Sequence, residues 1–343
     1  MDRTRSRLAP VTLGVSVLVL VAVAVGATLI GAAGLGWTRV ARELIAQLTG
    51  GTSPLSEQEA AIVWQLRVPR VVLAGLVGAA LAVAGAAFQG VFRNPLADPF
   101  LLGAAAGAGM AATLVVVAAP ARSGWPVDPL PLAAFAGALG GVALSWLLGR
   151  SAGGGTAVLL LAGIAVAAFL TAIQTFAQQL NTDTIKDVYT WMLGGLTTAG
   201  WHEVLLTLPY IGSAAMVLWQ CGRLLDVLAV GDDEAASLGI RPGRVRLVVL
   251  AAASLATAAA VAVSGLIGFV GIVVPHVVRL LAGASYRIVV PLSLIGGAAF
   301  LIVADEIART AVAPAELPIG VITAFAGAPF FVVVLRLNRG RIR

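Results

Sequence analysis

Long stretches without a charged residue limit how this sequence can fold. They lie at 8–38, 71–92, 99–121, 129–149, 151–182, 204–222, 247–278, 288–304 and 317–335. A helix needs roughly 20 apolar residues to cross the hydrocarbon core of a bilayer. Charged residues make up only 11% of the chain, against about 25% in an average soluble domain, which excludes an ordinary water-soluble exterior. The sequence therefore predicts an all-α polytopic membrane protein.

The number of spans follows from the stretch at 247–278, which is too long for one crossing. It contains several glycines and Pro275, which break helices, and a break near 264–267 gives about ten transmembrane helices. With ten spans, fifteen of the 22 Lys and Arg residues fall on one side of the membrane. Because cytoplasmic loops are rich in Lys and Arg, we expect both termini to be cytoplasmic. The predicted organisation is a single transmembrane domain over 1–343, with its longest cytoplasmic loop at about 222–243.

The first stretch follows three arginines, as a signal peptide would, but it is longer than the ~7–15 apolar residues of a cleavable signal. We therefore expect an uncleaved first span, with a signal peptide as the alternative. The external connection at 38–69 is expected to be partly helical and to lie along the surface.

The residue content also excludes several kinds of site. One Cys and two His are too few for a disulfide framework or a Cys/His metal cluster, so no metal site is predicted. A P-loop requires a lysine after glycine, and the only lysine, Lys186, lies in Thr-Ile-Lys-Asp. We therefore expect neither an enzyme nor a directly bound cofactor; ATP and Mg²⁺ would have to bind a separate subunit. The net charge of +6 is assigned to membrane-flanking loops, so the expected partner is the lipid bilayer and not nucleic acid.

The cytoplasmic loop contains the signals of a short helix. Asp232 or Asp233 could cap its first turn, Gly239 stands where it must end, and Pro242 suits the start of the next helix. Ala235, Ala236 and Leu238 would give the short helix a small apolar face. The pattern fits either an interfacial loop helix or a docking helix for a cytoplasmic partner, and both interpretations stay open here.

A second cytoplasmic connection reads Arg-Asn-Pro-Leu-Ala-Asp-Pro over 93–99. Pro95 and Pro99 separate two helices, Asp98 can cap the second, and Asn94 can satisfy loose backbone groups. A structural role is favoured over direct contact with a transported solute.

Two further patterns lie within the spans: a histidine that follows a proline, and a stripe of polar residues. His276 follows Pro275, and it could pair with Ser264 as the dyad of an intramembrane hydrolase; without an oxyanion-hole motif or an orienting acid, a structural histidine is favoured. Thr171, Gln174, Gln178 and Gln179 fall on one side of the fifth span. That stripe suits either the lining of a solute pathway or a contact between helices.

Three external arginines, Arg67, Arg70 and Arg309, lie at span edges. They could be snorkelling residues, a basic patch for an acidic partner, or local partners of Asp305, Glu306 and Glu316.

Four stretches resemble the FecCD-type permeases of ABC importers. They are Arg67-Val-Pro-Arg70; Gly85-Ala-Ala-Phe-Gln-Gly-Val-Phe-Arg-Asn-Pro-Leu-Ala-Asp-Pro99 followed by Leu102-Gly103; Gly268-Phe-Val-Gly-Ile-Val-Val-Pro-His-Val-Val-Arg279; and Glu316-Leu-Pro-Ile-Gly-Val-Ile-Thr-Ala-Phe-Ala-Gly-Ala-Pro329-Phe330. The resemblance covers essentially the whole chain. Its motif residues are Gln89, Asn94, Pro95, Asp98, Pro99, Pro275, His276, Arg279, Glu316, Pro318 and Pro329. The sequence departs from the family pattern at Gly195, where a serine is usual, and at Glu306, where an apolar residue is common.

The resemblance implies the type II ABC importer permease fold and a homodimer with the pathway on its two-fold axis. It also implies two copies of a cytoplasmic ABC ATPase and an extracytoplasmic substrate-binding protein. Arg67, Arg70 and Arg309 would meet acidic residues of the binding protein. The loop residues Gly231, Asp232, Asp233, Ala235, Leu238 and Gly239 would form the coupling helix that contacts the ATPase.

The function expected from this resemblance is import of an iron-siderophore complex, or of heme or cobalamin, across a bacterial or archaeal cytoplasmic membrane. A self-sufficient secondary carrier or channel is the alternative, although no span carries the isolated carboxylate that ion-coupled carriers often use. An intramembrane hydrolase is a second, less favoured alternative.

Overall fold

The computed structural model describes residues 8–31, 34–118 and 128–338, and within them the regular structure is helical. The helices are α1 Pro10–Leu29, α2 Trp37–Thr49, α3 Glu57–Ala61, η1 Ile62–Arg67, α4 Val68–Phe92, η2 Pro99–Leu102, α5 Ala104–Ala118, α6 Pro129–Ser151, α7 Thr156–Leu180, η3 Thr182–Thr184, α8 Ile185–Met192, α9 Trp201–Gln220, α10 Gly222–Val230, α11 Asp232–Ser237, α12 Pro242–Ser264, α13 Val270–Ala282, α14 Tyr286–Thr310 and α15 Ile319–Asn338.

The helices match the predicted spans. Among the described residues, six are long and apolar enough to cross a membrane, and α9 with α10 adds a seventh, bent by 50°. Three shorter apolar helices, α5, α13 and α15, complete the set. Each predicted span contains one of these, and the break predicted near 264–267 is confirmed, because α12 ends at Ser264 and α13 begins at Val270. The connection at 38–69, predicted to be external, is partly helical as expected.

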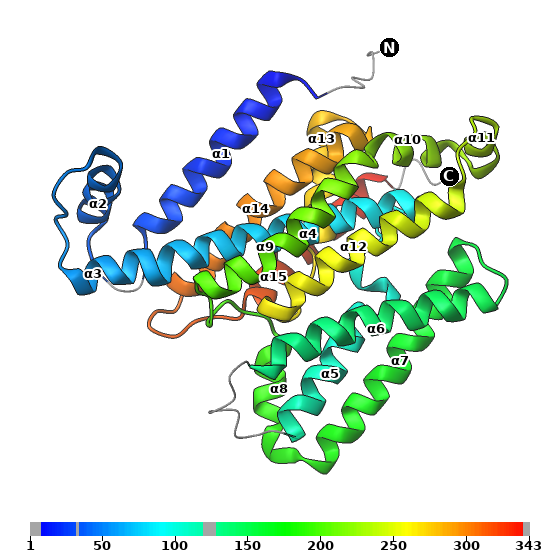
Figure 1. The fold of residues 1–343 in the computed structure, drawn as a ribbon, viewed down its shortest axis with the longest axis horizontal. Coiled ribbons are helices and arrows are strands. Elements are labelled where there is room, and N and C mark those ends of the chain that lie inside the picture. Colours follow the sequence, from blue (N-terminus) through cyan, green and yellow to red (C-terminus); the bar gives the residue numbers. More distant parts are fainter. Residues whose placement is uncertain (1–7, 32–33, 119–127, 339–343) are drawn as a thin grey trace.

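Helix α4 forms the centre of the molecule, enclosed by α9, α12, α13 and α14 (Figure 1). It consists largely of Ala, Gly, Val and Leu, and 78% of its most apolar window is buried inside the protein. Two glycines allow its neighbours to approach closely: a Cβ at Gly78 would overlap the backbone of Gly297 in α14, and one at Gly85 would overlap Gly271 in α13. Such small-residue crossings replace the hydrophobic effect as the basis of helix packing in lipid.

Helices α5, α6 and α7 pack together beside this core (Figure 1). At one end of the bundle lie α2 and α3, and at the other lie α10, α11 and the last turns of α15 (Figure 1). The structure therefore separates the predicted external connection from the predicted cytoplasmic loop.

Candidate functional site: the coupling end, the arginine cluster and the apolar cavity

The predicted loop helix exists as α11, but its cap differs from the prediction. Gly231 is the N-cap residue and no side chain caps the helix, so capping by Asp232 or Asp233 is wrong. Both carboxylates lie instead in the first turn, where the helix dipole favours them. Gly239 has a φ of 79° just after the helix, and Pro242 begins α12, as predicted.

Asp232 ties α11 to two spans. Its carboxylate accepts hydrogen bonds from Arg93, which follows α4, and from Arg246 of α12, at 2.6 Å for the latter. The hydrogen bond from Arg246 is the main cause that lowers the pKa of this carboxyl. Arg93 also donates to the carbonyl of Leu228 in α10, at 2.7 Å. A displacement of α11 must therefore move, or break away from, the adjoining ends of α4 and α12.

The opposite side of this segment is open. Leu238 is 69% exposed and Val230 72%, whereas Ala235 is fully buried and anchors the helix. Sequence analysis missed α10 and the roles of Arg93 and Arg246. The sequence feature that could have revealed these ion pairs was an acidic run, 232–234, between basic segments.

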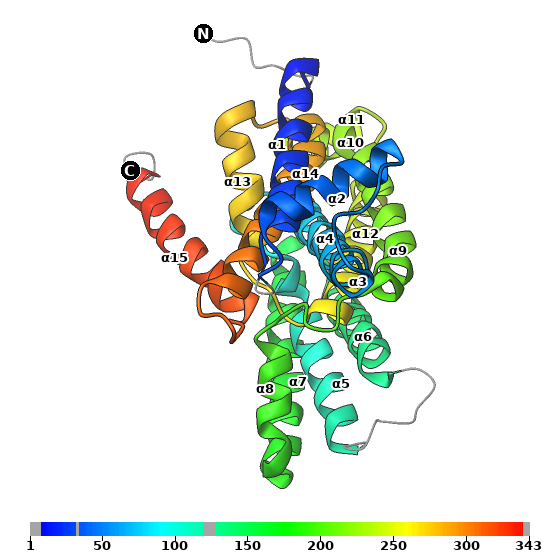
Figure 2. The ribbon, with the colours of Figure 1, turned by 90° about the vertical axis from the view of Figure 1, so that its left-hand side faces the viewer.

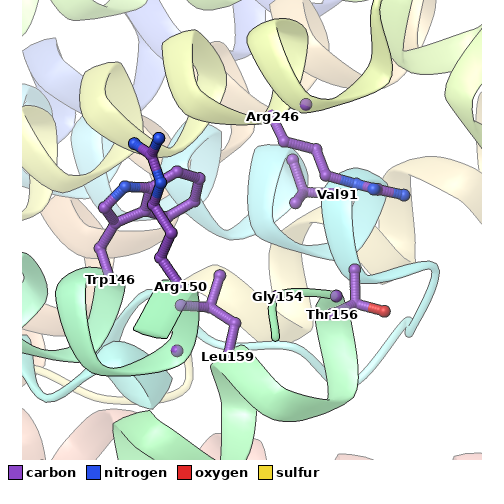
Figure 3. Close-up of a pocket in the computed structure, with 10 residues that line it drawn as sticks. Val91, Trp146, Arg150, Gly154, Thr156, Leu159 and Arg246 are labelled. Atoms are coloured by element: carbon purple, nitrogen blue, oxygen red, sulfur yellow. The ribbon is translucent and has the colours of Figure 1, made fainter. Parts of the chain in front are cut away.

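A cavity of about 130 Å³ lies beside this end of the bundle, between α6, α7 and α12 (Figure 3). Trp146 and Leu159 contribute apolar surface to its wall, and Arg150 and Arg246 extend along it as well. Its wall includes Gly154 of the turn that precedes α7.

The three arginines predicted to be external come together in one cluster, and local pairing dominates it. Arg70 donates to Asp305 at 2.9 Å and to Glu316 at 2.9 Å. Nε of Arg309 lies 3.0 Å from Oδ2 of Asp305, and Arg309 also pairs with Glu306. Asp305 is 1% exposed, so it is a buried anion shared between two cations.

Arg67 lies in the same cluster, close enough to Arg309 and Glu306 to interact with both electrostatically, and it also contacts α1. It is 6% exposed, its Nη1 lies 3.4 Å from the carbonyl oxygen of Thr28, and its guanidinium packs against Gly31. In this single chain the arginines are thus largely buried. Docking of a binding protein at these arginines stays a prediction. Ion pairs with neighbouring acids, which were the alternative, are observed in the structure.

The motif residues around 89–99 hold helices together. Gln89 donates to the carbonyl of Gly271 at 2.9 Å and accepts from Arg279, which links α4 to α13. Asp98 accepts from the backbone of Phe100 at 2.8 Å, the cap predicted for the helix beginning at Pro99. Asn94 accepts from the backbone of Leu96 at 2.9 Å. The structural interpretation of this connection therefore agrees with the contacts, and Pro95 lies in the same turn.

The segment that follows α8 is bonded to the end of α12 and to the start of α15, and we call this contact the glycine junction. Gly195 donates to the carbonyl of Ser264 at 2.8 Å, and Ile319 and Gly320 donate to Gly194 and Leu193 at 3.0 and 3.1 Å. These bonds satisfy backbone groups that lipid could not. The segment after Pro318 is thereby fixed, so this glycine junction positions the start of α15.

An apolar cavity of about 630 Å³ opens beside the glycine junction. Its lining has no charged side chain and includes Met192, Phe269, Phe325 and Pro329. Phe269 has a φ of 67°, which is rare for an aromatic residue, and its ring lies against Gly327 of α15. The cavity is therefore lined in part by a residue in a strained backbone conformation that packs closely against α15.

Among the described residues, the contacts of Ser264 and His276 do not bring these two side chains into a catalytic arrangement. Ser264 donates to the carbonyl of Ala260 at 2.9 Å, whereas His276 packs edge-on against Phe330 with ring centroids 5.6 Å apart. Neither contact activates a nucleophile.

The polar stripe of α7 divides between two environments. Gln174 is 4% exposed and donates to the sulfur of Met192 at 2.9 Å, which is a contact between α7 and α8. Thr171 and Gln179 are exposed and Gln178 is half-buried. Pathway lining stays a prediction for this stripe, Gln174 included. Among the described residues, no group of three or more His, Cys, Asp or Glu side chains could hold a metal ion.

Comparison with known proteins agrees with this architecture. The model of the FecCD transport family matches residues 15–337. The chain is 42% identical to the uncharacterized ABC transporter permease protein YvrB of Bacillus subtilis, over 81% of this chain and 80% of that protein. It is 39% identical to the cobalamin import system permease protein BtuC of Halobacterium salinarum, over 95% and 88% of the two chains.

The hemin transport system permease protein HmuU of Yersinia pestis is 39% identical, over 81% of this chain and 85% of its own length. A solved structure of a metal-chelate type ABC transporter in an inward-facing conformation superposes with a TM-score of 0.82 and 27% identity. It covers 96% of this chain and 99% of the other. The chain belongs to the FecCD transport family and is a permease subunit of an ABC importer.

Proposed function

We propose that two copies of this chain form the pathway by which an iron-siderophore complex, heme or cobalamin enters the cytoplasm. ATP and Mg²⁺ bind two copies of a separate cytoplasmic ABC ATPase, and an extracytoplasmic binding protein delivers the cargo. The names of two relatives, a cobalamin and a hemin permease, support a chelate as cargo. The host membrane is the cytoplasmic membrane of a bacterium or archaeon, with both termini inside.

The observation that carries the proposal is the set of hydrogen bonds that holds α11 to the end of α4 and to α12. Its exposed side offers Leu238 to a partner, while Asp232 on its other side is bonded to Arg93 and Arg246. An ATPase that moves α11 would therefore pull on α4 and α12 together. Because α4 is the central helix, this movement would reach the whole bundle and alternate the access of the pathway.

The apolar cavity beside the glycine junction supports the pathway part of the proposal. Its lining from α8, α15 and the 266–269 segment is uncharged, so a bulky chelate would meet no group that could hold it tightly. A transporter needs such weak binding, since the cargo must leave again on the other side.

Docking of the binding protein is proposed at Arg67, Arg70 and Arg309. Glu316 is the most exposed acid of this cluster, with a side chain 38% exposed. An acidic group of the binding protein could replace Glu316 at Arg70 without exposing Asp305. Long-range attraction between the two proteins would then act mainly on the rate of association.

The coupling part is tested by placing a charge on the exposed side of α11. The Leu238→Glu variant should fold, because the side chain is 69% exposed, but it should lose co-purification with the ATPase and at least about tenfold of ATP-driven chelate uptake. The matched control is Thr49→Glu in α2 at the other end of the bundle, where the side chain is also exposed and lies outside the proposed docking cluster. Unchanged ATPase recovery and uptake in Leu238→Glu would contradict the proposal.

A panel of ferric siderophore, heme and cobalamin in the same uptake assay identifies the cargo.

A further inference from the structure

Helix α2 divides into three longitudinal faces, although it is only 13 residues long. One face is packed against the protein, with Val40 and Glu43 fully buried and Ala46 9% exposed. The second face is apolar but open, and the third is polar and open. A helix with only two environments, protein and water, would not need the second of these faces.

The open apolar face consists of Trp37, Ile45 and Leu48, which are 67%, 59% and 88% exposed. At 3.6 residues per turn these positions lie within about 80° of one another around the helix. The open polar face begins directly beside it and contains Thr38, Arg42 and Thr49, all exposed. The boundary between apolar and polar surroundings therefore runs along the helix axis.

The packed face is held firmly, so the direction of the apolar face is fixed. Glu43 accepts hydrogen bonds from Ser53, from Gln47 at 3.2 Å and from the indole of Trp64 at 3.0 Å. Arg39 forms two hydrogen bonds of 2.7 Å with Glu59, which fastens α2 to α3. Rotation of α2 to hide its apolar face would break these contacts.

The position of α2 identifies what covers that face. It lies between α1 and α4, both of which are membrane-spanning candidates, and its axis runs across theirs: Figure 1 shows α2 nearly end-on while α4 lies along the page, and Figure 2 shows the reverse. A helix across the end of two spans lies in the plane of the bilayer surface, at the level of the headgroups.

We propose that α2 is an interfacial helix that immerses Trp37, Ile45 and Leu48 in the lipid leaflet at this end of the bundle. An in-plane helix with one apolar and one polar face is the form that binds a bilayer surface, and tryptophan is enriched at that depth. Arg42, on the neighbouring polar face, points its charge toward the headgroups and water. The immersed helix braces α1, of which only 11% of the most apolar window is buried in the protein.

The experiment uses the full chain with Cys221 replaced by serine, reconstituted in vesicles of phosphatidylcholine and phosphatidylglycerol. A fluorophore is attached to Leu48→Cys or, as the matched control, to the adjacent Thr49→Cys on the polar face. A lipid carrying a nitroxide near its headgroup should quench the Leu48→Cys label at least about twofold more strongly than the Thr49→Cys label. Iodide in the aqueous phase should give the opposite order.

Two outcomes would overturn the proposal. If iodide quenches both labels equally, α2 stands clear of the bilayer. If the Leu48→Cys label is shielded from both quenchers, protein covers the face; cross-linking at Leu48→Cys then shows whether that protein is a second copy. Neither result depends on the cargo or the ATPase, so failure here leaves the proposed function intact.

Discussion

Asp305 is the residue on which the external arginine cluster depends. It is 1% exposed and lies against both Arg70 and Arg309, so its removal leaves buried cations without their common anion. Breaking a buried ion pair by removing one partner costs about 3–5 kcal/mol. We expect Asp305→Asn to lower the melting temperature in detergent by at least about 5 °C.

The control for this variant is Glu316→Gln, because Glu316 also pairs with Arg70 but its side chain is 38% exposed. An exposed pair contributes at most about 1 kcal/mol, so the melting temperature should change little. Equal shifts for the two variants would show that burial does not set the strength of this cluster.

Two aspartates show what the sequence could and could not predict at this scale. The cap made by Asp98 was predictable, because the Asp-Pro pair and its bonded backbone group are adjacent in the chain. The pairing of Asp232 with Arg93 was not, because Arg93 is 139 residues away and only the fold brings it close. The backbone at Gly231 then decides that Asp232 faces these arginines and does not cap α11.

At the scale of helices, the crossing of α4 with α14 depends on glycine at one position and not at the next. A Cβ at Gly78 would overlap the carbonyl oxygen of Gly297, whereas a Cβ at Gly75 would lie 3.5 Å from Ile302, an ordinary contact. We expect Gly78→Ala to destabilise the fold by about 1–3 kcal/mol, the usual cost of overpacking. Gly75→Ala, one turn earlier, should be neutral or stabilising by up to about 1 kcal/mol through helix propensity.

Thermal unfolding of the two alanine variants in the same detergent measures this difference. If Gly78→Ala and Gly75→Ala melt alike, the backbones of α4 and α14 are farther apart than the structure places them, and small residues would not be what sets this crossing.

The helices themselves were largely predictable, because length and hydropathy define a span almost independently of its neighbours. The break between Ser264 and Val270 was also predictable from its glycines. The bend of 50° between α9 and α10 was not, since no proline or long polar run marks it. The burial of Gln174 could not be predicted either, because a polar stripe has the same sequence whether it faces a pathway or a neighbouring helix.

For the whole molecule, the distribution of cationic residues predicts a single orientation in the membrane. The segment around α10 and α11 and the start of α12 carries Arg223, Arg241, Arg244 and Arg246. The 311–318 turn at the other end of the bundle, by contrast, contains no Lys or Arg. Because Lys and Arg near span ends stay in the cytoplasm, α11 should face inward and the 311–318 turn outward.

Single cysteines in the Cys221→Ser background measure this orientation in intact cells. A membrane-impermeant thiol reagent should label Val312→Cys at once and Leu238→Cys only after the membrane is opened; both side chains are exposed, at 53% and 69%, so access to the reagent and not burial sets the result. The reverse pattern would place α11 outside, where no ATP-driven partner could reach it, and the coupling proposal would fall with it. Labelling of both sites in intact cells would instead indicate mixed insertion, which the charge asymmetry argues against. The predicted pattern places the moving helix and the energy source on the same side of the bilayer, as an importer driven by a separate ATPase requires.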